Sequence, residues 1–296
     1  EIGQAHDGSL GILHSYIDAL AQTGVDAIKF QIHIAEAESS IHEPFRVNFS
    51  YEDKTRYDYW KRMSFSLEQW QGVKQHCDKV GLEFLASPFS QAAVDLLEEL
   101  QVKRYIIGPG EVSNFLMLQN ICLTGKPIIL SSGMSSFNEL DKAVEFIQEH
   151  GNHLSILQCT TSYPTPAEKL GLNVIPQLKA RYPKATIGLS EHTGTIYAGL
   201  AAAAIDAEIL EFHVVFDKRM FGPDATSSLT IDQVTELVKG IQFIEQANAN
   251  PVDKSSSSDF DELKSIFEKS LAVNKNLKKG HQLLFEDLET KKPKGL

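Results

Sequence analysis

Strand-like and helix-like segments alternate along most of this chain of 296 residues. Eight short apolar runs are typical of buried strands: residues 1–6, 26–32, 83–89, 104–108, 127–131, 154–159, 185–192 and 207–213. Between and after them lie stretches with helical periodicity: residues 10–20, 67–80, 90–100, 114–124, 136–150, 170–181, 195–206 and 230–247. Such alternation implies parallel strands joined by right-handed crossovers, and eight units are the number that closes a barrel. The sequence therefore predicts an α/β protein, a (β/α)8 TIM barrel. The alternative is an open doubly wound sheet, but no G-x-G-x-x-G motif follows the first strand.

Two stretches depart from this alternation. Residues 34–66 form a long polar and aromatic insertion. Loops of this length are uncommon in compact domains unless they are functional, so we expect this segment to be a lid over the substrate site or a wall that lines it. Residues 249–258, which end in four serines, are typical of a flexible linker. We therefore divide the chain into a barrel over residues 1–248, the linker, and a C-terminal segment over residues 259–296, where a short helix is expected from Phe260 to Lys269.

Charge and cysteine content narrow the class of protein. With 28 Lys and Arg against 39 Asp and Glu, the net charge of −11 argues against binding to nucleic acid or to an anionic membrane, although a small anion responds to the local field. The three cysteines are far apart and show no CxxC spacing, which suits a reducing compartment. Because no transmembrane segment or signal peptide is recognisable, we expect a cytoplasmic protein.

Polar residues gather where the predicted strands end, which is where a TIM barrel places its active site. They are Glu1, His6, Lys29, Gln31, Ser87, Glu111, Ser131, Ser132, Thr160, Thr161, Tyr163, Ser190, His192, Glu211 and His213. A buried charge such as Lys29 or Glu211 is costly unless it is paired, so each could belong to a structural ion pair. Their recurrence on nearly every strand favours a functional site.

Two histidines end consecutive predicted strands. His192 and His213 are separated by one helix, so adjacent parallel strands would bring both imidazoles to the same rim. Imidazole binds zinc, iron, manganese and other divalent ions when carboxylate, water or substrate oxygens complete the shell. One strand-end histidine alone is more often structural, but the equivalent placement of two predicts a metal site.

The residue types at this rim indicate a chemistry. Lys29 offers a cation, and Ser87, Ser131 and Ser190 offer hydroxyl donors for phosphate or carboxylate oxygens. A metal could polarise a carbonyl, with Glu1 and Glu211 as general acid or base. The set suggests carbon–carbon bond formation or cleavage with a phosphorylated or carboxylated partner.

Seven motifs carry a family resemblance, in order along residues 1–248. They are EIGQAHDG at 1–8, DAIKFQ at 26–31, SPFS at 87–90, PIILSSGM at 127–134, CTTSYPTP at 159–166, GLSEHT at 188–193 and GPD at 222–224. Together they resemble the sialic acid synthase family, which includes N-acetylneuraminate synthases and spore-coat, legionaminic and pseudaminic acid relatives. The segments 270–280 and 286–295 resemble the opening of the small antifreeze-like domain that follows the barrel in these synthases, incomplete in this chain.

The resemblance implies a reaction. The family condenses phosphoenolpyruvate with an N-acetylated hexosamine, commonly N-acetylmannosamine, to give a nine-carbon 2-keto sugar acid and phosphate. By this resemblance His192 and His213 hold manganese or magnesium. The catalytic residues would be Glu1, Lys29, Gln31 and Glu211. Phosphoenolpyruvate would bind at Lys29, Ser87, Ser131, Tyr163 and Ser190, and the sugar at Gln31, Tyr163, Glu211 and Asp224. The family's antifreeze-like domain reaches across a dimer, so a homodimer is expected.

The sequence also departs from the family pattern. Where the family carries Lys-Ile-Gly-Ser-Gly-Glu, this chain has Ile106-Ile-Gly-Pro109-Gly-Glu, so two phosphate donors are missing. Thr161, Glu191 and Phe212 replace the usual asparagine, aspartate and lysine. Arg104 shares a side with Ile106 but lies further from the rim, so it is a poor substitute. We therefore expect weak phosphoenolpyruvate affinity or another donor. The alternatives are a metal-dependent keto-acid aldolase or lyase, and a catalytically silent sugar-binding relative.

Overall fold

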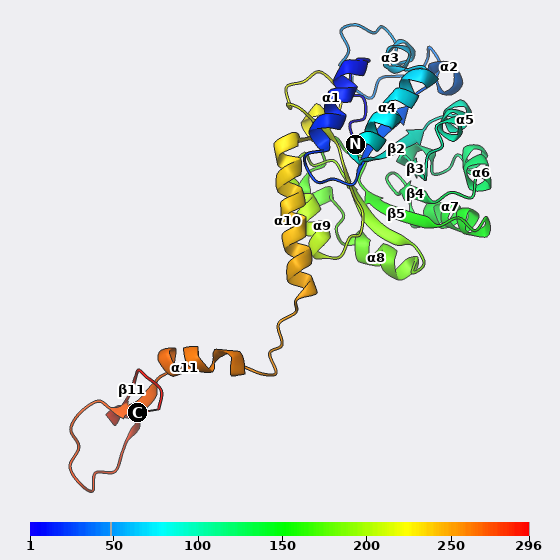
Figure 1. Ribbon diagram of the computed structural model, residues 1–296. Coiled ribbons are helices and arrows are strands. Elements are labelled where there is room, and N and C mark those ends of the chain that lie inside the picture. The colour runs from blue at the N-terminus through cyan, green and yellow to red at the C-terminus, as the bar shows by residue number, and fades with distance from the viewer. Residues whose placement is uncertain (48, 296) are drawn as a thin grey trace. The chain divides into compact units, whose positions relative to one another are not determined.

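The computed structural model describes residues 1–47 and 49–295, and it divides into two compact units (Figure 1). The first unit is Glu1–Gln246, and the second begins at Ala247. Each is described by itself below. No helix in the described ranges is long and apolar enough to cross a membrane.

A curled sheet of parallel strands forms the centre of the first unit. β1 (Ala27–Ile32) pairs with β2 (Glu83–Pro88), and β8 (Val214–Val215) pairs with β9 (Leu229–Thr230). Between them, five strands pair in chain order: β3 (Tyr105–Ile107), β4 (Ile128–Ser131), β5 (Leu154–Cys159), β6 (Thr186–Glu191) and β7 (Leu210–Phe212). β2 lies beside β3, and the helices surround the strands on the outside (Figure 1). Consecutive strands are thus neighbours, as the alternation predicts.

The two ends of this sheet meet through the first residues of the chain. Gly3 forms a parallel bridge with Phe30 of β1, and the Val214 backbone nitrogen donates to the Glu1 carbonyl at 2.8 Å. The prediction of a full strand over residues 1–6 is wrong, because the chain turns directly after this bridge. The last predicted strand, 207–213, is also shorter than expected. β7 begins only at Leu210, and His213 separates it from β8.

Six helices follow the predicted pattern closely, with ends set by capping. They are α1 (Leu10–Leu20), α4 (Leu67–Val80), α5 (Gln91–Glu99), α6 (Phe115–Leu123), α7 (Phe137–Glu149) and α9 (Ile196–Ala204). α4 matches its prediction residue for residue: Ser66 and Gln69 form a capping box at its start, and Gly81 ends it with a φ of 84°. α10 (Ile231–Ala249) runs two residues beyond its predicted end. α8 (Val174–Arg181) begins four residues late, because Gly171 turns the chain with a φ of 74°.

Alternation along the strands sorts side chains between two sides of the sheet. Ile28, Phe30 and Ile32 of β1 join the main core, which lies between the sheet and the helices. The intervening Lys29 and Gln31 point to the other side. There, Ile106, Ile129 and Leu157 form a small separate apolar layer.

The insertion over residues 34–66 contains α2 (Ala35–Glu38) and α3 (Arg56–Met63). Its own small core consists of Ala35, Tyr59, Trp60 and Met63, against which Phe45, Phe49 and Tyr57 pack. The insertion is therefore an ordered aromatic layer over its described residues, which agrees with the prediction of a wall.

The second unit contains one short helix and one hairpin. α11 (Asp261–Phe267) lies within the predicted helix, and β10 (Ser270–Val273) pairs antiparallel with β11 (Leu288–Lys291). The buried carboxylate of Asp287 pairs with Lys275 and with His281, the latter at 2.6 Å. Nothing in these elements tests whether the unit opens an antifreeze-like domain, so that assignment stays a prediction.

Candidate active site

A cavity of about 230 Å³ lies at the carboxyl ends of the strands. Its lining includes ten of the eleven side chains predicted for the site: Glu1, Lys29, Gln31, Ser87, Tyr163, Ser190, His192, Glu211, His213 and Asp224. Ser131 is the exception: it is buried beside the Cys159 thiol, and it is Cys159 that lines the cavity. The strand ends thus bring together residues that are up to 223 positions apart in sequence.

Lys29 forms the charged centre of the cavity. Its ammonium lies 3.1 Å from Glu1 Oε2 and 3.2 Å from Glu211 Oε1, and the three side chains are only 3–10% exposed. Gln31 Nε2 donates to Glu1 Oε1 at 2.7 Å, and Ser190 Oγ donates to Glu211 Oε1 at 2.8 Å. One ammonium thus serves two buried carboxylates, so its removal would leave both without their cation.

The pKa values of Glu1 and Lys29 keep these two groups charged at neutral pH. Burial raises the pKa of Glu1, but Lys29 and His213 outweigh it and hold that pKa well below its usual range. Burial lowers the pKa of Lys29, but Glu1 and Glu211 hold it well above its usual range. Lys29 is therefore a cation shared by two carboxylates and is not freely available to an anionic substrate.

His192 and His213 lie next to each other, as predicted. Their ring centroids are 5.3 Å apart, and His213 Nε2 lies 3.3 Å from Glu1 Oε2. His192 Nδ1 is buried and has no hydrogen-bond partner among the described residues. Burial, together with His213, lowers the pKa of His192 to about 3, so this imidazole is neutral and its lone pair is available.

The histidine pair fits an open metal site with two protein ligands. No group of three or more His, Cys, Asp or Glu side chains in the described part of the chain has the arrangement of a metal site. A metal at this position would therefore take its remaining ligands from substrate or water oxygens, as catalytic metal ions commonly do. The unpartnered nitrogen of His192 is the observation that supports this fit.

The opposite wall of the cavity carries a second ion pair. The Arg46 guanidinium lies 4.1 Å from the centre of the Tyr163 ring and pairs with Asp224 at 2.6 Å. Phe45, Phe49, Tyr59 and Trp60 of the insertion line the same wall. The sequence predicted a wall here but not Arg46, whose partner lies 178 residues away.

Buried hydroxyls without partners mark a further part of the cavity. Ser87 Oγ and Thr161 Oγ1 are buried and accept or donate no hydrogen bond within the described ranges. A side chain at Gly133 would meet Thr161 Oγ1 at 2.5 Å and Cys159 Sγ at 2.9 Å, so only glycine fits there. Unpaired buried donors are costly unless a ligand satisfies them. These hydroxyls are therefore candidates to hold an anion.

Ile106 and Pro109, the two residues that replace phosphate donors of the family pattern, have different surroundings in the structure. Pro109 lines the cavity, whereas Ile106 packs in the apolar layer with Ile129 and Leu157 and does not reach it. Arg104 pairs with Glu83 at 2.8 Å and is absent from the lining, so it does not replace the missing donors.

The fold is α/β, and the named relatives of this chain are enzymes. The NeuB family model matches residues 16–253, and this chain belongs to the NeuB family. It is 32% identical to the N,N'-diacetyllegionaminic acid synthase of Campylobacter jejuni, over 99% of this chain and 89% of that protein. It is 31% identical to the N-acetylneuraminate-9-phosphate synthase of Homo sapiens, over 85% of this chain and 70% of that protein. Among solved structures, that of the N-acetylneuraminic acid synthetase of Leptospira borgpetersenii superimposes on this chain with a TM-score of 0.78 at 28% identity. The superposition covers 89% of this chain and 88% of the Leptospira chain.

Proposed function

We propose that this enzyme condenses phosphoenolpyruvate with an N-acetylated amino sugar, of the N-acetylmannosamine type, to form a nine-carbon 2-keto sugar acid and phosphate. The named synthases among its relatives support this general reaction. The observation that carries the proposal is the buried centre of Lys29, Glu1 and Glu211 beside the histidine pair. Keto-acid cleavage and a silent sugar-binding role are not favoured, because the named relatives are synthases.

The proposed reaction makes one carbon–carbon bond and, at the neighbouring carbon, replaces the phosphate oxygen by a water oxygen. The enol carbon of phosphoenolpyruvate attacks the sugar aldehyde, whose oxygen takes up a proton and becomes a hydroxyl. Water adds at the neighbouring carbon, and the bond from that carbon to the phosphate oxygen breaks to leave the ketone and phosphate. Manganese or magnesium at His192 and His213 would polarise the aldehyde carbonyl. The water must give up a proton, and we assign its acceptance to Glu211, because its Oε2 is buried and has no partner within the described part of the chain.

The other side chains orient the two substrates. Ser87, Thr161 and Tyr163 offer hydroxyls to the anionic substrate, and Ser190 adds one if it exchanges its bond to Glu211. On the opposite wall, Asp224 can accept hydrogen bonds from sugar hydroxyls while Arg46 holds it in place. This arrangement puts the sugar against the insertion and phosphoenolpyruvate against the strand ends. A closed eight-stranded ring and a homodimer remain part of the proposal.

Phosphate release tests this function directly. The protein is supplied with phosphoenolpyruvate, manganese or magnesium, and one of several amino sugars, with and without an N-acetyl group. We expect phosphate to appear only when both substrates are present, in equal amount to a 2-keto acid product. Cleavage of the keto acid without phosphate would instead support an aldolase. The absence of any turnover, together with sugar binding by calorimetry, would support the silent relative.

A further inference from the structure

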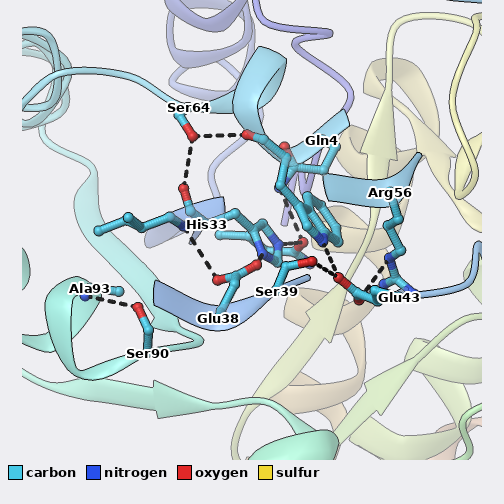
Figure 2. Close-up of polar contacts among 12 residues, drawn as sticks. Gln4, His33, Glu38, Ser39, Glu43, Arg56, Ser64, Ser90 and Ala93 are labelled. Atoms are coloured by element: carbon cyan, nitrogen blue, oxygen red, sulfur yellow. Dashed lines mark hydrogen bonds and ion pairs between the residues drawn. The ribbon is translucent and has the colours of Figure 1, made fainter. Parts of the chain in front are cut away.

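His33 occupies an enclosed position directly after β1, at the edge of the cavity. Its ring is stacked between Trp60, at a centroid distance of 3.7 Å, and Phe89, at 4.2 Å, with interplanar angles of 12°. Its Nδ1 lies 2.6 Å from Glu38 Oε1 (Figure 2). Its Nε2 lies 3.1 Å from Gln31 Oε1. Only 8% of the residue is exposed. Both ring nitrogens and both ring faces are therefore in contact with named partners.

The neighbouring carboxylate fixes which way the Gln31 amide points. The group of Gln31 that faces Glu1 Oε1, at 2.7 Å, is the amide nitrogen, which donates to the carboxylate. The amide oxygen of Gln31 then faces His33 Nε2, and a second donor, Gln4 Nε2, approaches the same oxygen at 3.3 Å. His33 Nε2 must consequently carry a proton.

The other nitrogen of His33 also faces an acceptor. Its Nδ1 lies 2.6 Å from Glu38 Oε1, and Glu38 Oε2 accepts a hydrogen bond from the Ile34 backbone nitrogen at 3.3 Å. Glu38 is thus tied both to the His33 ring and to the backbone beside it. Together with the two aromatic faces, Glu38 holds the ring in one orientation, with Nε2 directed at Gln31.

We propose that His33 is a positioning residue of this active site. Anchored by Glu38, it fixes the orientation of the Gln31 amide, and Gln31 in turn holds Glu1 against Lys29 and His213. The kinetic consequence rests on the proposed function, whereas the arrangement itself can be tested without turnover.

The titratable groups around His33 come from three parts of the chain. Glu38 of α2 is in direct contact with the ring, and Glu1, in the first residues of the chain, lies on the far side of Gln31. His6 belongs to the same N-terminal segment, and Glu111 ends the short helix Pro109–Glu111. Burial raises the pKa of Glu111, which His33 counteracts, and burial lowers the pKa of His6 to about 4, with a contribution from His33.

Two substitutions separate the two bonds of His33. The amide of glutamine can place a donor where Nε2 lies, so His33→Gln keeps the bond to Gln31 and loses that to Glu38. The amide of asparagine reaches only the position of Nδ1, so His33→Asn keeps the bond to Glu38 and loses that to Gln31. Both variants lose the same ring stacking, so they should have similar thermal stability and are matched controls for each other.

We expect His33→Asn to lose roughly 100-fold in kcat with little change in KM, because a small displacement of a reacting group has effects of this size. His33→Gln should stay within a few-fold of the native enzyme. Equal loss in both variants, or loss that follows thermal stability, would overturn the proposal, because a merely structural ring predicts that result.

Nuclear magnetic resonance of the substrate-free protein gives an independent readout. With 15N-labelled histidine, Nε2 of His33 should show the shift of a protonated nitrogen, assigned by its loss in His33→Gln. The side-chain amide signal of Gln31 should move in His33→Asn and stay in His33→Gln. An unprotonated Nε2 in the native protein, or an unmoved Gln31 signal in His33→Asn, would refute the positioning role. A protein that passes these tests but never releases phosphate would refute only the proposed function.

Discussion

The two walls of the cavity are built in different ways. On the strand side, Lys29, Glu1 and Glu211 are almost fully buried, and each charge is matched by another. On the insertion side, Arg46 and Asp224 form a pair whose side chains are 39% and 21% exposed. The difference teaches that the strands fix the reacting centre, whereas the insertion adds contacts that can change with little effect on the fold. Changes in the first wall should therefore cost stability and activity together, and changes in the second should alter substrate binding alone.

The largest effect is expected from Lys29→Met. Removal of the cation leaves Glu1 and Glu211 buried without their partner, which typically costs about 3–5 kcal/mol in the free energy of unfolding. Activity should be lost completely. Chemical denaturation and phosphate release measure the two effects, and Arg46→Met is the control from the other wall. If Lys29→Met lost as little stability as Arg46→Met, the two walls of the cavity would not differ in their contribution to the fold.

The same centre should make stability depend on pH in a defined way. The pKa of Glu1 is depressed in the folded protein, so its contribution is present above its unfolded pKa, about 4.3, and is lost as pH falls. The pKa of Lys29 is raised, so its contribution is present below about 10.4 and is lost as pH rises through the folded value. The stability difference between native protein and Lys29→Met should therefore be constant from about pH 5 to 9 and shrink below about pH 4. Denaturation at a series of pH values checks this, and a maximum of the difference in acid would contradict it.

Metal binding should depend on residues of the strand side and not on residues of the insertion side. His213→Ala removes one of two imidazole ligands, so we expect metal affinity to fall by more than the roughly 10- to 100-fold typical of lost supporting contacts. Thermal unfolding should stay cooperative, because His213 lies between β7 and β8 at the rim and outside the main apolar core. Metal content after dialysis, measured beside the unfolding curve, decides this. Unchanged metal content would show that His213 is not a ligand, and Arg46→Met again serves as the control.

Arg46→Met should act on the acceptor sugar. Loss of the guanidinium frees Asp224 and uncovers Tyr163, so we expect KM for the sugar to rise about tenfold, equivalent to the roughly 1.4 kcal/mol of one charge-assisted contact. KM for phosphoenolpyruvate should change less, because Arg46 contacts the face of the Tyr163 ring and not its hydroxyl. Because the pair is partly exposed, the free energy of unfolding should fall by less than about 1 kcal/mol. A larger effect on phosphoenolpyruvate than on the sugar would reverse the assignment of the two walls.

The sequence predicted the strand side of the site well, for a physical reason. Parallel strands end at a common edge, so the polar residues after each apolar run, from Lys29 to His213, had to converge. Side-chain direction on short strands was harder to predict: Ile106 faces an apolar layer, and Ser131 lies beside Cys159 outside the cavity lining. On the insertion side, the sequence predicted a wall and Asp224 but not Arg46. The contacts of Arg46 and His33 depend on a chain path without periodicity, which no local pattern encodes.

The smallest effect is expected from Pro109→Ser, which tests the part of the cavity whose unpartnered hydroxyls are candidates to hold an anion. Pro109 lines the cavity near the unpartnered hydroxyls, so a serine there adds one donor, which is worth about 0.5–1.5 kcal/mol, or up to about tenfold in phosphoenolpyruvate affinity. Ile106→Lys, the other change toward the family pattern, would instead place a charge in the apolar layer with Ile129 and Leu157 and should destabilise the protein. Titration calorimetry and unfolding curves of both single variants separate these outcomes. If Ile106→Lys tightened phosphoenolpyruvate binding without loss of stability, position 106 would have to reach the cavity, and the division of the strand side into an apolar layer and a polar rim would fail.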